Sequence, residues 1–154
     1  MTKIVHPLAG ALAILTIATF WLSTVFSELF GSRTVITSVK TAIPWGFLLL
    51  VPALAAAGGS GFALARERRG AALIDSKMKR MRIIAANGIL ILIPSALFLA
   101  SKARAGEFDE AFYAVQALEL VAGATNLALL AVNLRDGLKL TGRLRPRHMS
   151  QRRP

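Results

Sequence analysis

A glutamate stands inside the last long apolar segment of the chain, where a charged side chain is rare. Glu119 lies within 111–134, which is otherwise rich in Ala, Leu and Val and is long enough to cross a bilayer. A carboxyl group that faces lipid costs several kcal/mol. Glu119 is therefore expected to face protein or a water-filled cavity. There it could bind a proton or a cation, or it could simply hydrogen-bond a neighbouring helix.

Polar residues on this segment recur with Glu119 at a seven-residue period. The stripe comprises Phe112, Gln116, Glu119, Gly123, Asn126, Leu130 and Asn133. Five of these seven are polar or glycine, so the stripe is predicted to face other helices. No Lys, Arg or His is expected at the depth of Glu119, which is therefore predicted to be protonated or hydrogen-bonded to neutral groups. A proton or ion site there would draw on Gln116, Asn126, Thr16 and Asn87.

A histidine at the start of the first apolar segment is the second candidate. A neutral imidazole at the end of a membrane helix can ligate the iron of a b-type haem. In that case His6 would be one axial ligand, and Met78, Met81 or a second subunit could supply the other. The propionates could be held by Arg80, Arg82 and Arg135. The alternative is a histidine at the level of the lipid headgroups that binds no cofactor.

Other chemistry has little support in the sequence. The chain has no cysteine, which excludes disulfides, thiolate metal sites and cysteine nucleophiles. No serine is paired with a histidine at a useful spacing, and no phosphate-binding loop or metal-ligand cluster is present. An enzyme is therefore not expected unless a cofactor brings the chemistry.

The elements that must position these residues are predicted to be membrane helices. Of the 154 residues, 55% are hydrophobic, against about 45–50% in soluble domains. Residues 1–142 are expected to form one four-span domain, with spans at 7–29, 41–65, 83–100 and 111–134. The remaining residues, 143–154, read as a basic, disordered tail. Interior prolines Pro52 and Pro94 predict a kink in the second and third helices.

A second inward stripe is expected on the first helix. At the seven-residue spacing it contains His6, Ala9, Ala13, Thr16, Phe20, Ser23 and Ser27. Most of these residues are small or polar, which is typical of helix contacts in a membrane.

The basic residues predict the orientation of the chain. Fifteen of the nineteen Lys and Arg lie in the N-terminal tail, in the hydrophilic loop expected at 66–82, or in the C-terminal tail. The positive-inside rule then places both termini in the cytoplasm. Short connections predict an all-α, up-down four-helix bundle in a bacterial inner membrane. The net charge of +11 is explained by this topology, and a nucleic-acid partner is not expected.

Two families share parts of this plan. Four spans with one embedded acid, Glu119, resemble the small multidrug-resistance exporters, although their acid lies in the first helix and this one lies in the fourth. Four helices with a histidine at one end, His6, resemble small b-type membrane cytochromes such as the cytochrome b561 group, which carry several helix histidines. The first resemblance implies a proton-coupled transporter, and the second implies a haem redox protein.

The leading interpretation is a small non-enzymatic accessory or interaction subunit. Small-residue runs such as 55–61 let helices approach closely, so a homo-oligomer or a larger membrane complex is expected, with membrane lipid around it. The haem protein using His6 and the proton-coupled transporter using Glu119 are the two alternatives.

Overall fold

The computed structural model describes residues 2–66 and 72–140, and these residues are almost entirely helical. The predicted tail at 143–154 lies outside the described residues. The elements in chain order are α1 (Thr2–Phe30), α2 (Arg33–Arg66), α3 (Ala72–Asn87), the short π-helix η1 (Gly88–Leu92), α4 (Ile93–Ala105) and α5 (Glu110–Leu140). The segments α3, η1 and α4 follow one another without a break, so the described chain forms four long helical rods.

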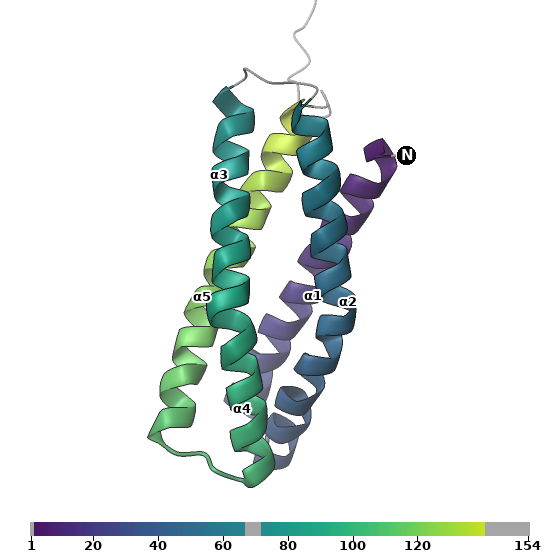
Figure 1. The fold of residues 1–154 in the computed structure, drawn as a ribbon. Helices are drawn as coiled ribbons and strands as arrows, with labels where there is room; N and C mark the ends of the chain where they lie inside the picture. Colours follow the sequence, from purple (N-terminus) through teal and green to yellow (C-terminus); the bar gives the residue numbers. More distant parts are fainter. Residues whose placement is uncertain (1, 67–71, 141–154) are drawn as a thin grey trace, which may run out of the picture.

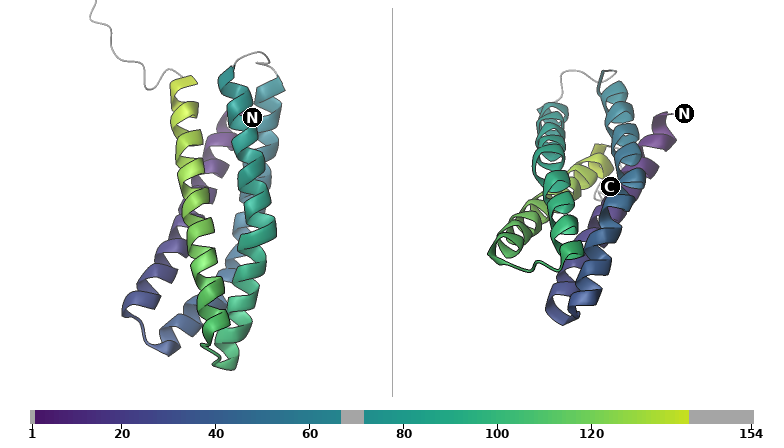
Figure 2. Two further views of the ribbon diagram at one scale, coloured as in Figure 1. Left: turned by 90° about the vertical axis from the view of Figure 1, so that its left-hand side faces the viewer. Right: turned by 60° about the horizontal axis from the view of Figure 1, so that its bottom comes forward.

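The four rods run alternately up and down, and both ends of the described chain lie at the same end of the bundle (Figures 1 and 2). Around the bundle, α1 packs beside α2 and α5, and the α3–α4 rod packs beside the same two helices. The helices α2 and α5 are diagonal to each other and make no close backbone approach in the described part of the chain. Any contact between them must therefore cross the interior through side chains.

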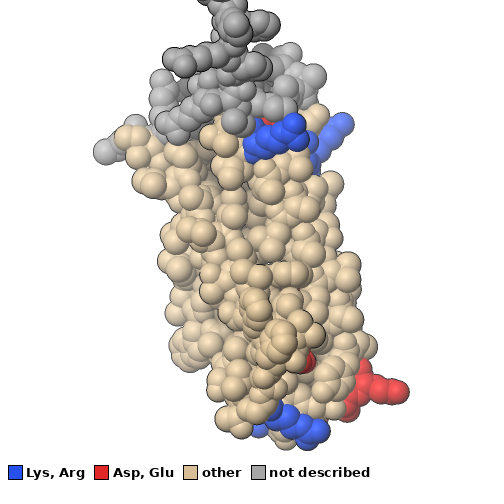
Figure 3. Space-filling view, turned by 180° about the vertical axis from the view of Figure 1, so that it is seen from behind, with Lys and Arg blue, Asp and Glu red and all other residues tan. Residues whose placement is uncertain are grey.

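Each rod is long and apolar enough to cross a membrane. The candidate spans are Ile4–Phe30, Arg33–Ala63, Met78–Ala105 and Glu110–Leu138. Figure 3 shows a broad, largely uncharged surface, with mainly basic side chains at one end and side chains of both signs at the other. Leu, Phe, Val and Ile side chains lie exposed on this surface. The molecule therefore has the features of a multi-pass membrane protein.

The second helix begins eight residues earlier than the predicted span. The sequence places a polar connection before Thr41, but α2 already begins at Arg33. The hydroxyl groups in this first part donate to carbonyls of the preceding turn, as Thr37 does to Arg33 and Ser38 to Thr34. Because these hydroxyl groups find hydrogen-bond acceptors within their own helix, a polar composition is compatible with a helix here.

The third rod also extends further than predicted. The sequence suggests a hydrophilic loop over 66–82, but α3 begins at Ala72. A π-turn over Gly88–Leu92 then precedes Pro94, and the Ile93 N–H bonds the Gly88 carbonyl. Proline has no N–H to donate, and the wider π-turn adjusts the hydrogen-bond ladder just before it. The distortion expected at Pro94 is present in this form, and the helix continues through it.

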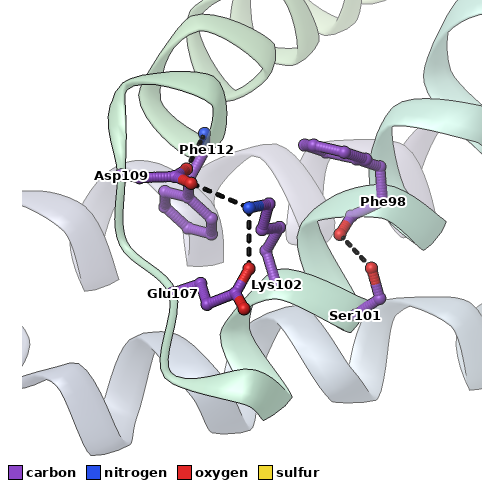
Figure 4. Close-up of polar contacts among 6 residues, drawn as sticks. All are labelled: Phe98, Ser101, Lys102, Glu107, Asp109 and Phe112. Atoms are coloured by element: carbon purple, nitrogen blue, oxygen red, sulfur yellow. Dashed lines mark hydrogen bonds and ion pairs between the residues drawn. The ribbon is translucent and has the colours of Figure 1, made fainter.

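The connection between α4 and α5 is tightly ordered by its charges (Figure 4). Gly106 ends α4 in the left-handed conformation, which suits glycine. The Lys102 ammonium donates to both Glu107 and Asp109 at 2.7 Å, and Asp109 accepts the backbone N–H of Phe112 at 2.9 Å. The hydrogen bonds from Lys102 and from Phe112 hold the pKa of Asp109 below its usual value. Asp109 thus caps α5, as an acidic residue at a helix start does.

Both predicted inward stripes are confirmed by burial. On α5 the seven residues of the stripe are buried or, for Glu119, largely so: Phe112 is fully buried and Asn126 is 2% exposed. On α1 the residues of the seven-residue stripe are buried or half-buried. The apolar interior between the polar positions forms two clusters, one around Leu99 and Phe112 and one around Ile17 and Leu130.

A glycine of α5 is required by a close contact with α1. The Trp21 indole N–H donates to the Leu120 carbonyl at 3.0 Å, which fixes the ring against the α5 backbone. A Cβ at Gly123 would come within 2.9 Å of the Trp21 ring. The anchored indole cannot move aside without losing its hydrogen bond, so only glycine fits there.

Gly123→Ala is therefore expected to destabilise the bundle by about 1–3 kcal/mol through overpacking. Gly58→Ala is the matched control, because a Cβ at Gly58 meets open space. That substitution should leave stability unchanged or raise it by up to about 1 kcal/mol through helix propensity. Unfolding in detergent micelles, followed by circular dichroism, measures both. Equal effects of the two substitutions would contradict the Trp21 contact.

Candidate functional site

A buried ion pair crosses the interior of the bundle from α2 to α5. The Lys40 ammonium lies 2.6 Å from Glu119 Oε2 and donates to the Thr24 hydroxyl on α1 at 3.4 Å. The Lys40 side chain is 1% exposed and that of Glu119 is 12% exposed. Counting from the helix starts, Lys40 and Glu119 lie about 10 and 13 Å into their helices at 1.5 Å per residue. The pair therefore lies within the apolar part of the bundle, nearer the end that carries the α1–α2 and α4–α5 connections.

The prediction that Glu119 has no cationic partner is wrong. It assigned Lys40 to a polar connection outside the membrane, whereas α2 carries Lys40 well inside the bundle. The long lysine side chain spans the gap between the diagonal helices. A buried carboxylate is stabilised far more by a close ammonium than by neutral hydrogen-bond partners.

A second carboxyl group lies close to this pair. Glu28 on α1 interacts electrostatically with both Lys40 and Glu119, and its Oε1 atom is buried without a hydrogen-bond partner in the described structure. The sequence placed Glu28 at the end of its span, where it would reach water. Neither Glu28, Lys40 nor Thr24 was among the predicted site residues. Among these groups, only Glu119 forms an ion pair with the Lys40 ammonium in the described structure.

Gln116 is buried beside the same group of residues. It lies one helical turn before Glu119 on the inward stripe and is 4% exposed. Both polar atoms of its amide are buried and have no hydrogen-bond partner among the residues that the structure describes. Most buried polar groups in proteins are hydrogen-bonded, so two unsatisfied atoms on one side chain are unusual.

A small cavity adjoins the ion pair on the side of the bundle centre. Its volume is about 60 Å³, which leaves room for a few water molecules. Glu119 and Thr24 provide its polar wall, and the rest of the lining is mainly aromatic and aliphatic, with Phe20, Trp21, Phe47, Leu50 and Leu92. The cavity is far too small for a drug-sized molecule.

The other residues predicted to join Glu119 lie elsewhere. The Asn87 amide donates to Asn126 Oδ1 at 2.8 Å and to the Ala122 carbonyl at 2.9 Å, which links the α3–α4 rod to α5. Thr16 donates to the Leu12 carbonyl of its own helix. Asn126 is two helical turns from Glu119. Of the predicted set, only Gln116 therefore lies next to Glu119.

The residues named in the haem hypothesis lie in different surroundings. His6 Nδ1 lies 3.0 Å from the Ala57 carbonyl and 3.3 Å from the Ser60 hydroxyl, and its ring packs against Gly61. Met81 packs against an apolar cluster to which α1 contributes Ile14 and Ile17. These two residues lie about two to three helical turns from His6 along α1.

Of the three arginines of that hypothesis, Arg82 and Arg135 are exposed. The arginine that does face protein is Arg80, which donates to Asn133 at 2.8 Å and pairs with Asp136. His6 joins α1 to α2, and Arg80 joins α3 to α5.

Comparisons with protein-family models, characterised proteins and solved structures find no match for this chain. Its class is that of a four-helix, multi-pass membrane protein, and its function has to be inferred from the geometry.

The ion pair makes a sharp prediction about paired substitutions. Lys40→Met or Glu119→Gln alone leaves one buried polar group without its partner and is expected to destabilise the bundle by about 3–5 kcal/mol. The double variant removes both groups and should recover most of that loss, since a neutral pair needs no compensating charge. A double-mutant cycle of unfolding in detergent measures the coupling. Additive losses would show that the pair does not exist in the folded protein.

Proposed function

We propose that this chain is a small non-catalytic interaction subunit that self-associates in the membrane through an exposed face of α2. The α2 small-residue face comprises Pro52, Ala55, Ala56, Gly59 and Ala63, all exposed. These positions recur every three or four residues and so lie along one side of the helix.

The single observation that carries the proposal is that packing within the chain explains only some of the glycines on α2. A Cβ at Gly46 would overlap Phe20, and one at Gly61 would lie 3.0 Å from His6, so both glycines are explained by packing within the chain. A Cβ at Gly58 or Gly59 would meet nothing within 4 Å. Each glycine costs a helix about 1 kcal/mol relative to alanine. Gly59 lies on the α2 small-residue face, so a second helix packed there would explain it.

The physics of the membrane supports this use of small residues. Lipid tails are as apolar as leucine, so helices associate by close van der Waals packing rather than by burial from water. Small side chains on α2 would let a second helix approach closely. A symmetric pair of two copies is the simplest assembly with a self-complementary surface.

The distribution of basic residues supports a cytoplasmic position for both ends of the chain. The termini of the described chain, the end of α2 and the start of α3 lie at one end of the bundle. In the sequence, fifteen of the nineteen Lys and Arg lie near or beyond these helix ends. The positive-inside rule favours a bacterial inner membrane with this end inward.

Gly59→Leu and Ala55→Leu are expected to weaken self-association by about 1–3 kcal/mol, because each inserts a bulky side chain into a close contact. The dissociation constant would rise roughly 5- to 150-fold. Energy transfer between labelled copies, followed as the protein is diluted with lipid, measures this.

Ala42→Leu is the matched control for these two variants. Ala42 is exposed on the same helix but lies outside the α2 small-residue face. It should leave association unchanged. Wild-type protein that stays monomeric at every dilution would remove the proposal.

The orientation is tested by reporter fusions. A phosphatase that is active only in the periplasm should be silent when it is fused after Pro154. It should be active when it is inserted after Gly106, in the connection between α4 and α5. The reverse pattern would mean that the basic end faces outward.

A further inference from the structure

The cluster around Lys40 contains two carboxyl groups but one ammonium group. Lys40 is ion-paired with Glu119, and Glu28, whose Oε1 atom is buried without a hydrogen-bond partner, lies close enough to both for Coulombic interaction. When all three groups are ionised, the cluster has a net charge of −1. Water does not screen a charge well inside a protein, so one further positive charge would be bound favourably there.

Gln116 lies at the right level to take part in binding. Thr24 on α1 and Glu119 on α5 both contact the Lys40 ammonium. The helices α1 and α5 are antiparallel neighbours (Figure 1). One turn further toward the connections, α1 presents Glu28 and α5 presents Gln116. Two of the three side chains with unsatisfied buried atoms, Glu28 and Gln116, therefore occupy the same layer of the bundle.

The chemistry of these unsatisfied atoms suits a carboxylic acid. A protonated carboxyl group has one O–H donor and a carbonyl acceptor, and a primary amide has the complementary acceptor and donor. A neutral Glu28 could thus exchange two hydrogen bonds with the Gln116 amide. An ionised Glu28 could use only the N–H group and would leave the amide oxygen unsatisfied.

A metal cation fits this cluster less well than a proton. The Lys40 ammonium already occupies the position between Glu119 Oε2 and Thr24 Oγ1 that a metal would need. No group of three His, Cys, Asp or Glu suitable for a metal ion exists in the described ranges. A proton needs no such coordination shell. Glu28 is half-buried, so water can reach it and supply that proton.

We propose that Glu28, Lys40, Glu119 and Gln116 form a site that binds one exchangeable proton. The Glu28 carboxylate accepts the proton from water and becomes a carboxylic acid, and no other covalent bond changes. Lys40 and Glu119 remain ion-paired. The cluster becomes neutral, and the acid pairs with the Gln116 amide. This site is independent of the α2 small-residue face.

The test is pH-difference infrared spectroscopy of the full chain in lipid nanodiscs. Lowering the pH should produce a C=O stretching band of a protonated carboxyl group in wild-type protein. Glu28→Gln, which keeps the shape of the side chain, should abolish that band. Gln116→Leu should keep the band but shift its frequency, because the hydrogen bonds to the amide are lost. Glu110→Gln is the control, since Glu110 is exposed at the start of α5, and it should leave the band unchanged.

Three results would overturn the proposal. The first is a band of full size in Glu28→Gln, and the second is the absence of any such band in wild-type protein. The third is loss of the band when sodium chloride replaces choline chloride at constant pH, which would make the ligand a metal cation. If Glu28→Gln fails to fold, the frequency shift in Gln116→Leu decides: an unshifted band would exclude the acid–amide pair.

Discussion

The arrangement of the bundle depends on the ion pair between Lys40 and Glu119. An isolated ion in an apolar interior loses its hydration, and only a close partner of opposite charge offsets that loss. Each of the two charged side chains therefore requires the other within ion-pair distance. Because α2 and α5 are diagonal, the pair fixes the distance across the bundle and the relative height of both helices. The interhelical contact on α1, through Thr24, ties a third helix to the same level.

The remaining polar contacts repeat this principle at other heights. His6 and Ser60 join α1 to α2 near the end that carries the termini, and Arg80 joins α3 to α5 through Asn133 and Asp136. Asn87 and Asn126 join the same two rods near the middle. A membrane offers little hydrophobic force to select one packing over another. A small number of hydrogen bonds at fixed levels can make that selection, because every misaligned arrangement would leave buried polar groups unsatisfied.

The inward faces of the helices could be predicted from the spacing of their residues. The position of Lys40 was predicted wrongly because its charge suggested a connection outside the membrane. The stripe through Glu119 and Asn126 was identified from the seven-residue spacing alone, and burial confirms it. Lys40 belongs to an equally regular stripe, with Ile36, Ile43 and Phe47 at the neighbouring positions. A scan that ends each span at a charged residue stops before this pattern can be seen. The glutamate on one helix and the lysine at an apolar position on another were together the available signal.

Other parts of the candidate site could not be derived from the sequence. Burial of Glu28 depends on how the α1 end packs against its neighbours, and spacing along one helix contains no such information. The haem hypothesis rested on residue types at one end of the bundle, whereas the structure holds His6 and Met81 in different surroundings. The level of a residue along its helix can be counted, but the neighbour that it faces depends on the order of the helices around the bundle.

The inner and outer faces of the helices serve different purposes in this molecule. Interior positions carry the charged and amide side chains, and each of these has a partner or belongs to the cluster around Lys40. The outer face of α2 has the opposite character, because Ala55, Ala56 and Gly59 present almost no side chain. Polar groups in the interior specify one arrangement of the four rods, since they cannot be left unpaired. Small residues outside impose no such demand within the chain, and the proposed contact with a second copy would account for their placement.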